Sequence, residues 1–404
     1  MRPGPDSLVP AGVRWLRSAG VDSPHTGYGH RPEWWWATEA GGGKLSDQVE
    51  IPADASALTA EWLTGVLRPA YPAAGAVTGV QAEPLGAGFG LLGALRRLRL
   101  RWEHPAGGGP DTLVAKLTAA GERSRAVADG IGLYRNEVCF NRHLAAAVPL
   151  AVCCHHAGFD EATGAFVLLL DDMGGAGTCD QIAGCPPDRA EAVVLALADH
   201  HAAHWDERGL DGHAWLRRVD DPSLVTPVAA AFAAGWPGVR DRAGDRLPPA
   251  VRDLGDRFGD LLPGLLAQLA AGPLTLSHGD LRLDNMFFGP GERVTLCDWQ
   301  LVDRSRGARD LAYFLTQSLT PSDRALVERP LVDRYLDRLA GHGIDYGRDQ
   351  AWHDYRAATL FSLLYPVVAG SGLDLDERSA QLTDVILDRC AAALVDLGCA
   401  GWER

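Results

Sequence analysis

The pattern of apolar and polar positions changes character where the apolar segment at 164–172 ends. Before that point, short apolar or alternating segments bounded by Gly and Pro predict strands at 77–90, 94–103, 111–119 and 164–172. The last of these, GAFVLLLDD, is almost entirely apolar and indicates a buried strand. A helix is predicted at 54–68, where a capping start precedes apolar residues at helical spacing.

The pattern beyond this point is mostly helical. One helical stretch is already predicted at 123–148, before the change, and others follow at 188–207, at 251–270 and in several segments between 322 and 397. The stretch 274–300 is the exception, because two short apolar runs flank a loop and a Gly-Pro turn and so predict a hairpin-like island among helices.

These patterns predict an α+β fold with two lobes. A small antiparallel sheet lobe is expected at 49–170 and a larger, mainly helical lobe at 171–404. Residues 1–48, rich in Gly, Pro and Trp, predict a partly irregular extension. We expect the Trp34–Trp36 triplet to pack on the body of the protein, with a role as a lid or ligand platform as the alternative. Clefts between lobes are preferred ligand sites.

Composition restricts the classes of partner. The formal net charge of −14 argues against a nucleic acid or an anionic membrane, because both bind basic surfaces. No apolar run is long enough to predict a signal peptide or a membrane span. We therefore expect a cytoplasmic protein, and no obligate protein partner is evident from the sequence.

Two stretches rich in His and Cys raise the question of metal binding, CCHH at 153–156 and HHAAH at 200–204. The eight Cys form no CxxC pair, and no second ligand cluster lies at zinc-finger spacing. Buried thiols and His residues on a helix face are the favoured interpretation, and a metalloprotein that uses these clusters is the alternative. Reduced Cys also fit the cytosol.

Lysine is rare in this chain. Of 38 basic residues only Lys44 and Lys116 are lysines. Lys116 interrupts the apolar run LVAKLT, and a compact ammonium kept where Arg is the usual cation suggests a specific requirement, although a solvated Lys on an edge strand is the plainer alternative. Glu137, on the helix predicted next, is a candidate partner for a buried ammonium.

The order of features in the first lobe indicates a nucleotide-phosphate cradle. Gly86, Gly88 and Gly90 lie between two predicted strands, where bare backbone N–H groups can approach a phosphate. A strand, the strand with Lys116, the helix with Glu137 and a buried strand then follow. Each feature is weak alone, and the order is what favours the interpretation.

The second lobe contains the stronger motif. His278, Asp280 and Asn285 have the spacing H-x-D-x-x-x-x-N, and Asp298 ends the next apolar run. Transfer of a phosphoryl group needs a carboxylate that orients and deprotonates the attacking hydroxyl, together with Mg²⁺ on the phosphates. An Asn amide oxygen and a carboxylate are hard ligands that suit Mg²⁺. His278 is expected to brace the loop rather than to react.

The segments SHGDLRLDN and LCDWQ resemble the aminoglycoside phosphotransferase/choline kinase group, which has the two-lobed protein-kinase-like fold. The resemblance covers about residues 80–320 and extends, as the group's helical substrate subdomain, toward the C-terminus. Gln300 of DWQ, with DLAYFL after it, is nearest to the ecdysteroid-kinase-like branch of that group. Residues 1–48 lie outside the resemblance.

The resemblance implies a role for each motif residue. Lys116 would hold the α- and β-phosphates of ATP and pair with Glu137, and Asp280 would be the catalytic base. Asn285 and Asp298 would hold Mg²⁺. The backbone from Leu170 to Asp172 would contact adenine, and Asp310 would be the group's structural Asp. His201 would occupy the position of the His in the "LH" pair that the group carries on a helix.

The predicted function is ATP- and Mg²⁺-dependent phosphotransfer to a hydroxyl of a small molecule. A protein substrate is disfavoured because Gly279 stands where protein kinases usually carry Arg, and because only eleven residues separate Asp298 from Asp310. Aminoglycosides, nucleosides, sterol or terpenoid alcohols and amino alcohols remain open as acceptors. Candidate wall residues of the acceptor site are Trp352, Tyr355, Arg356 and Tyr365, with ordinary core and surface positions of a helix as an equal alternative for each. A catalytically silent, nucleotide-binding scaffold is the alternative function.

Overall fold

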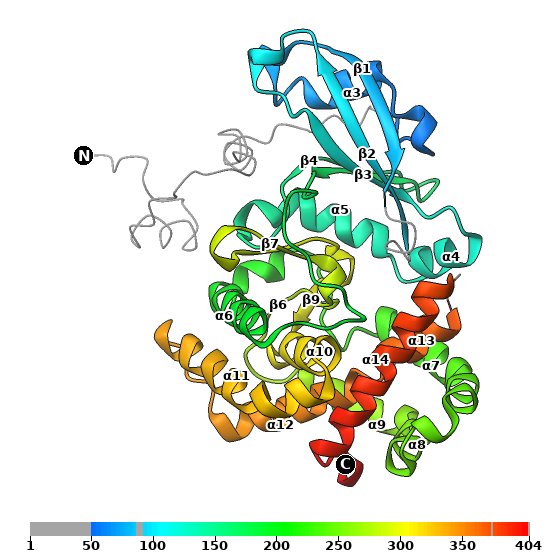
Figure 1. Cartoon of the computed structure of the whole chain (residues 1–404), viewed down its shortest axis with the longest axis vertical. Helices are drawn as coiled ribbons and strands as arrows, with labels where there is room; N and C mark the ends of the chain where they lie inside the picture. Colours follow the sequence, from blue (N-terminus) through cyan, green and yellow to red (C-terminus); the bar gives the residue numbers. More distant parts are fainter. Residues whose placement is uncertain (1–49, 86–91, 373–374, 403–404) are drawn as a thin grey trace.

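A five-stranded antiparallel sheet forms one end of the molecule, and a bundle of helices forms the other (Figure 1). The computed structural model describes residues 50–85, 92–372 and 375–402. The sheet has the order β1-β2-β3-β5-β4. Its strands are β1 (Val77–Pro84), β2 (Gly93–Trp102), β3 (Thr112–Thr118), β4 (Cys154–Phe159) and β5 (Phe166–Asp171).

The two faces of this sheet have different neighbours. Alternate residues of β3 and β5, such as Leu113, Ala115 and Leu169, pack with helix α3 (Ala60–Leu67) in a small core. Because side chains alternate between faces along a strand, Lys116 and Leu168 lie on the opposite face. That face turns toward α4 (Glu122–Gly130) and α5 (Leu133–His143), which lie between the sheet and the helical lobe in Figure 1.

The second lobe is built mainly from helices around one continuous hydrophobic core. Two small antiparallel pairs lie within it, β6 (Thr275–Ser277) with β9 (Asp303–Ser305) and β7 (Met286–Phe288) with β8 (Val294–Leu296). Helix α10 is buried along its whole length. The helices are α6 (Pro187–Ala203), α7 (Pro222–Ala243), α8 (Pro249–Asp256), α9 (Phe258–Leu269), α10 (Ala308–Ser318), α11 (Pro321–Gly341), α12 (Arg348–Phe361), α13 (Leu364–Gly372) and α14 (Glu377–Asp396).

The predicted α+β class with two lobes is confirmed, and so is the hairpin within 274–300. Two long predicted helices are each divided. The stretch 123–148 breaks into α4 and α5 at Gly132, whose φ of 69° departs from helical geometry, and 251–270 breaks into α8 and α9 at Arg257. Strand β4 was not predicted. The extension 1–48, with Trp34–Trp36, and Gly86, Gly88 and Gly90 lie outside the described residues.

Within the part of the chain that the structure describes, none of the helices combines the length and the apolar character needed to cross a bilayer.

His156 in β4 predicts a pH-dependent stability. Its ring lies 5.5 Å from that of Trp62, and its Nε2 is shielded from solvent without a hydrogen-bond partner. Burial lowers the pKa of His156 to about 4, and Arg142 adds to the effect. Between this value and the ordinary pKa of about 6.5 the unfolded chain binds the proton and the folded chain does not, so stability falls as the pH is lowered.

We expect His156 to contribute a loss of about 2 kcal/mol of unfolding free energy between pH 7.5 and pH 5. Denaturant unfolding of the wild type and of His156→Gln at both pH values measures it, because the variant lacks the titrating ring. His104→Gln, at an exposed position, is the control and should keep the wild-type pH dependence. Equal pH dependence in wild type and His156→Gln would contradict the assignment.

Candidate active site

A cavity of about 600 Å³ lies between the two lobes. The sheet lobe contributes residues of β2, β3 and β5 to its lining, and the helical lobe contributes the loop after β6 and parts of α7, α9, α13 and α14. Lys116, Glu137, Asp280, Asn285 and Asp298 all line it. The residues that the sequence singled out in two distant segments therefore meet at one cavity.

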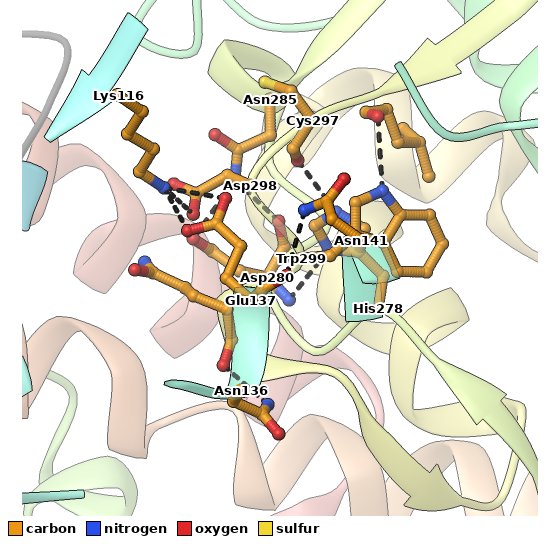
Figure 2. A network of polar contacts seen from close by, with 12 residues as sticks. Lys116, Asn136, Glu137, Asn141, His278, Asp280, Asn285, Cys297, Asp298 and Trp299 are labelled. Carbon is orange, nitrogen blue, oxygen red and sulfur yellow. Dashed lines mark hydrogen bonds and ion pairs between the residues drawn. The ribbon is translucent and has the colours of Figure 1, made fainter. Parts of the chain in front are cut away.

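Lys116 joins the two lobes. Its Nζ donates to both carboxylate oxygens of Glu137, at 2.9 and 2.7 Å, and to Oδ1 of Asp298 at 2.7 Å (Figure 2). Lys116 is 7% exposed and Glu137 is 1% exposed. A buried ammonium of this kind is tolerated only with such partners. One cation thus serves two carboxylates, one from α5 and one from the segment after β8.

The charges of this group follow from burial and from mutual attraction. Burial alone would lower the pKa of Lys116, but Asp298 and Glu137 outweigh it and hold that pKa above its ordinary value. Burial raises the pKa of Glu137, although Lys116 opposes the shift. For Asp298, the attraction of Lys116 outweighs burial and lowers the pKa. Asp298 is therefore ionised at neutral pH.

The loop after β6 is held by the buried carboxylate of Asp310. Its two oxygens accept hydrogen bonds from the backbone N–H groups of His278 and Gly279, at 2.6 and 2.9 Å. His201 lies 3.4 Å from the same carboxylate and helps to lower its pKa against the effect of burial. Asp310 and His201 thus fix the backbone that presents Asp280.

Both ring nitrogens of His278 are engaged by the backbone. Nε2 donates to the carbonyl of Cys297 at 3.0 Å, and Nδ1 accepts from the N–H of Asp280 at 3.2 Å. The ring also packs on Trp299, with ring centroids 4.5 Å apart. These bonds select the neutral Nε2–H tautomer, because a carbonyl can only accept and a backbone N–H can only donate. The ring therefore links the loop after β6 to the segment after β8.

The carboxylate of Asp280 is fixed by three side chains. Oδ1 accepts from the hydroxyl of Tyr313 at 2.8 Å, and Oδ2 accepts from Nδ2 of Asn285 at 3.1 Å. Nε of Arg282 lies 3.5 Å from Oδ2. Asp280 is 8% exposed and lines the cavity. A carboxylate held in this way can accept a proton from a group placed in the cavity.

Asn285 and Asp298 are neighbours because of the β7–β8 hairpin. The N–H of Cys297 donates to the carbonyl of Asn285 at 3.0 Å, just beyond the paired strands. The Asn285 amide nitrogen is used by Asp280, so its oxygen remains as a donor to a cation. Asp298 has φ 66° and ψ 57°, a left-handed conformation that Asp tolerates better than most residues. An amide oxygen and an ionised carboxylate are ligands that suit Mg²⁺.

The sheet-lobe end of the cavity is an apolar slot beside β5. Leu170 is 8% exposed there, and Asp172 follows the end of the strand. The carboxylate of Asp172 is bound by Arg97 of β2, at 2.8 and 3.1 Å, so the segment that links the lobes is tied to the sheet. Apolar residues around this slot are Leu85, Leu95, Val114, Val152, Leu170 and Met173.

Gly279 occupies a position that only glycine fits. Its φ is +82°, and an added Cβ would lie 2.3 Å from the carbonyl oxygen of Leu301. Gly279→Ala should therefore destabilise the protein by about 2–5 kcal/mol, from the left-handed backbone together with the clash. Gly343→Ala is a matched control, because its φ of +80° is similar and nothing lies within 4 Å of the added atom. Denaturant unfolding of both variants checks the prediction, and equal losses would contradict it.

The predicted acceptor wall needs correction. Of the four candidates only Tyr365 lines the cavity; Trp352, Tyr355 and Arg356 do not. Helix α12 turns these positions away, and Tyr355 is fully buried with its hydroxyl bonded to Glu328. Besides Tyr365, this part of the cavity is lined by aliphatic residues of several helices, which are Val225, Val228, Leu262, Leu266, Leu364, Val368, Leu382 and Ile386.

The two stretches rich in His and Cys also differ in structure. Cys153, His155 and Asp171 have ligand atoms within 4.8 Å of one another, and they are the only such group among the described residues. Both nitrogens of His155 are already engaged, by Tyr71 at 2.6 Å and by Asp171 at 2.7 Å. The His residues of 200–204 contact separate partners within the second lobe.

Three residues that the sequence analysis did not select also matter here, which are Tyr313, Arg282 and Asn136. Tyr313 follows Asp310 by three residues on α10, and that spacing on a helix could have placed it beside the loop. Asn136 donates to the carbonyls of Gln300 and Val302, at 2.8 and 3.0 Å, and so ties the helix of Glu137 to the segment after Asp298.

Comparison with known proteins places these residues in a wider context. Residues 215–346 match the model of the ecdysteroid kinase-like family. Among solved structures, the choline kinase of Cryptosporidium parvum Iowa II has a TM-score of 0.51 at 12% identity, with 79% of this chain and 91% of that chain covered. A comparison with curated protein sequences gives no match.

Two further structures resemble the chain less closely. The ethanolamine kinase of Plasmodium vivax has a TM-score of 0.46 at 13% identity, with 80% of this chain and 83% of that chain covered. The macrolide 2'-phosphotransferase of Brachybacterium faecium has a TM-score of 0.41 at 17% identity, with 80% and 98% covered. The likeness to the choline kinase of Cryptosporidium parvum Iowa II supports the two-lobed kinase-like fold, and with the family-model match it confirms the predicted resemblance to the aminoglycoside phosphotransferase/choline kinase group, through the ecdysteroid kinase-like branch.

Proposed function

We propose that this protein transfers the γ-phosphoryl group of ATP to a hydroxyl of a small molecule, in a reaction that depends on Mg²⁺. The observation that carries the proposal is the meeting of Lys116, Glu137 and Asp298 with Asp280 and Asn285 at one cavity between the lobes. A cation for phosphates, a fixed carboxylate base and two oxygen ligands for a metal ion are the parts that phosphoryl transfer needs.

Each residue has a role in this proposal. Lys116, positioned by Glu137, would bind the phosphates of the nucleotide, and the apolar slot beside Leu170 would take the adenine ring. Asp280 would orient the acceptor hydroxyl and take its proton as the oxygen attacks the γ-phosphorus. Asn285 and Asp298 would hold Mg²⁺, which neutralises charge on the phosphates when bound. His278 would only position the loop, because both of its ring nitrogens are engaged.

The acceptor end of the cavity favours an uncharged, largely apolar alcohol. Its walls are mostly aliphatic side chains of α7, α9, α13 and α14, together with Tyr313, Phe361 and Tyr365. Oδ2 of Asp303 in this region is paired with Arg309 at 2.6 Å, its Oδ1 is buried without a hydrogen-bond partner among the described residues, and Asp180 is paired with Arg378 at 2.6 Å. A polycationic aminoglycoside needs free carboxylates to replace the water around its ammonium groups. We therefore favour sterol or terpenoid alcohols among the acceptor classes.

The first experiment measures ADP release from Mg·ATP by the wild type, alone and with separate pools of aminoglycosides, nucleosides, amino alcohols, and sterol or terpenoid alcohols. We expect the last pool to stimulate release in the wild type and not in Asp280→Asn. Stimulation by aminoglycosides alone would overturn the acceptor class. Nucleotide binding without stimulation by any pool would favour the catalytically silent scaffold instead.

A further inference from the structure

Arg282 is a buried arginine two residues after Asp280, and its long contact with that carboxylate uses only part of its guanidinium. It is 7% exposed and lines the cavity. Nε is shielded from solvent and has no hydrogen-bond partner. Within the described residues, Nη1 and Nη2 also lack hydrogen-bond partners, and neither is among the shielded atoms. The two Nη groups are therefore open to the cavity.

Such an arrangement is costly unless a ligand completes it. A guanidinium carries five N–H donors, and a buried charge is stable only when it is paired and hydrogen-bonded. The single ion pair of Arg282, to Oδ2 of Asp280 at 3.5 Å, is too long for a good hydrogen bond. Burial disfavours the charge, but Asp280 and other nearby groups keep the pKa of Arg282 above its ordinary value, so the charge persists.

Arg282 is not required to satisfy Asp280. The two carboxylate oxygens of Asp280 already accept hydrogen bonds from Tyr313 and Asn285. A residue whose only purpose was to hold Asp280 would direct its paired nitrogens toward that carboxylate. Arg282 lines the same cavity as Lys116, Asp298 and Asp280, and it lies close enough to Asp298 for that charge to affect its pKa.

We propose that Arg282 binds the oxygens of the terminal phosphoryl group of the nucleotide through its Nη groups. The planar fork matches two phosphoryl oxygens, which a compact ammonium cannot do. During transfer, the acceptor oxygen forms its bond to the γ-phosphorus while the bond from that phosphorus to the β,γ-bridging oxygen breaks. The hydroxyl proton goes to Asp280, and ADP leaves. Arg282 then acts as a catalytic residue, because it contacts the group being transferred.

This inference rests on the proposed function, and nucleotide binding separates the two. The test measures the affinities of ADP and of a non-hydrolysable ATP analogue, both with Mg²⁺, for the wild type, Arg282→Gln and Arg282→Lys. We expect Arg282→Gln to lower the affinity for the ATP analogue by about tenfold or more. The affinity for ADP should change by less than about threefold, because only the analogue has the terminal phosphoryl group. Arg282→Lys should fall between wild type and Arg282→Gln.

A matched control tests the effect of replacing any buried arginine. Arg324 is 1% exposed, donates to Glu328 at 2.8 Å and does not line the cavity. Arg324→Lys should leave the ratio of the two affinities unchanged. Thermal unfolding of each variant accompanies the titrations, and Arg282→Lys carries the test if Arg282→Gln does not fold.

The outcomes are distinct. Equal weakening of ADP and the analogue in the Arg282 variants, or no change in either, would overturn the role of Arg282 while leaving the proposed function intact. A wild type that binds neither nucleotide would overturn the proposed function and this inference together. A selective loss of affinity for the ATP analogue supports the assignment even before an acceptor is known.

Discussion

Asp280→Asn is expected to lower kcat by about 10²–10⁴-fold and to leave the affinity for Mg·ATP nearly unchanged. An amide cannot accept the proton of the attacking hydroxyl, whereas the position of the side chain is set by Tyr313 and Asn285. The nucleotide would contact the other wall of the cavity, through Lys116. The loss should therefore appear in the chemical step and not in nucleotide binding.

Steady-state ADP release with a stimulating acceptor, together with nucleotide titration, measures both quantities. Asp284→Asn is the matched control, because it removes a carboxylate from the same loop and the same cavity. Asp284 takes no part in the hydrogen bonds that fix Asp280, so Asp284→Asn should lower kcat by no more than about tenfold. Turnover of Asp280→Asn near that of the wild type would refute the role of base.

The sequence predicted the parts of the site that depend on local spacing. His278, Asp280 and Asn285 lie within eight residues, and a hairpin pattern after them is enough to bring Asp298 alongside. The strand of Lys116 was predicted from its apolar run. Its contact with Asp298 joins residues 182 positions apart, and only the order of elements, or a resemblance, suggests it.

Several features depend on packing that no periodicity records. Helix α10 is buried on every side, so its pattern of apolar and polar residues does not reveal that Tyr313 faces the loop. Helix α12 has an aromatic face that looks suitable for a ligand, yet Tyr355 packs in the core. The residues that line the cavity beside α7, α9, α13 and α14 are mostly ordinary aliphatic side chains, which the sequence cannot distinguish from core.

Polar residues within β4 explain why the sequence did not predict this strand. Strand β4 contains His155 and His156 side by side, and that pair interrupts the apolar pattern expected of a strand. The structure accommodates His155 through bonds to Tyr71 and Asp171, and it shields His156 from solvent. Contacts with Tyr71, which follows α3, and with Asp171 of β5 thus stabilise a strand that the local sequence does not predict.

Asp298→Asn is expected to remove the effect of Mg²⁺ on nucleotide affinity and to lower kcat by on the order of 10³-fold. The wild-type carboxylate is ionised because Lys116 outweighs burial and lowers its pKa. An amide at this position keeps the shape and tolerates the φ of 66°, which an Ala would adopt only at a cost. The substitution therefore removes a charged ligand without disturbing the backbone.

Titration of a non-hydrolysable ATP analogue with Mg²⁺ and with a chelator measures this effect. We expect Mg²⁺ to strengthen binding to the wild type and to have little effect on Asp298→Asn. Lys116 keeps both hydrogen bonds to Glu137 in the variant, so the thermal unfolding temperature should change little. Asp298→Ala adds backbone strain, so it should lose the same Mg²⁺ effect and also unfold at a lower temperature. Wild-type Mg²⁺ dependence in both variants would show that Asp298 is a structural partner of Lys116 and not a metal ligand.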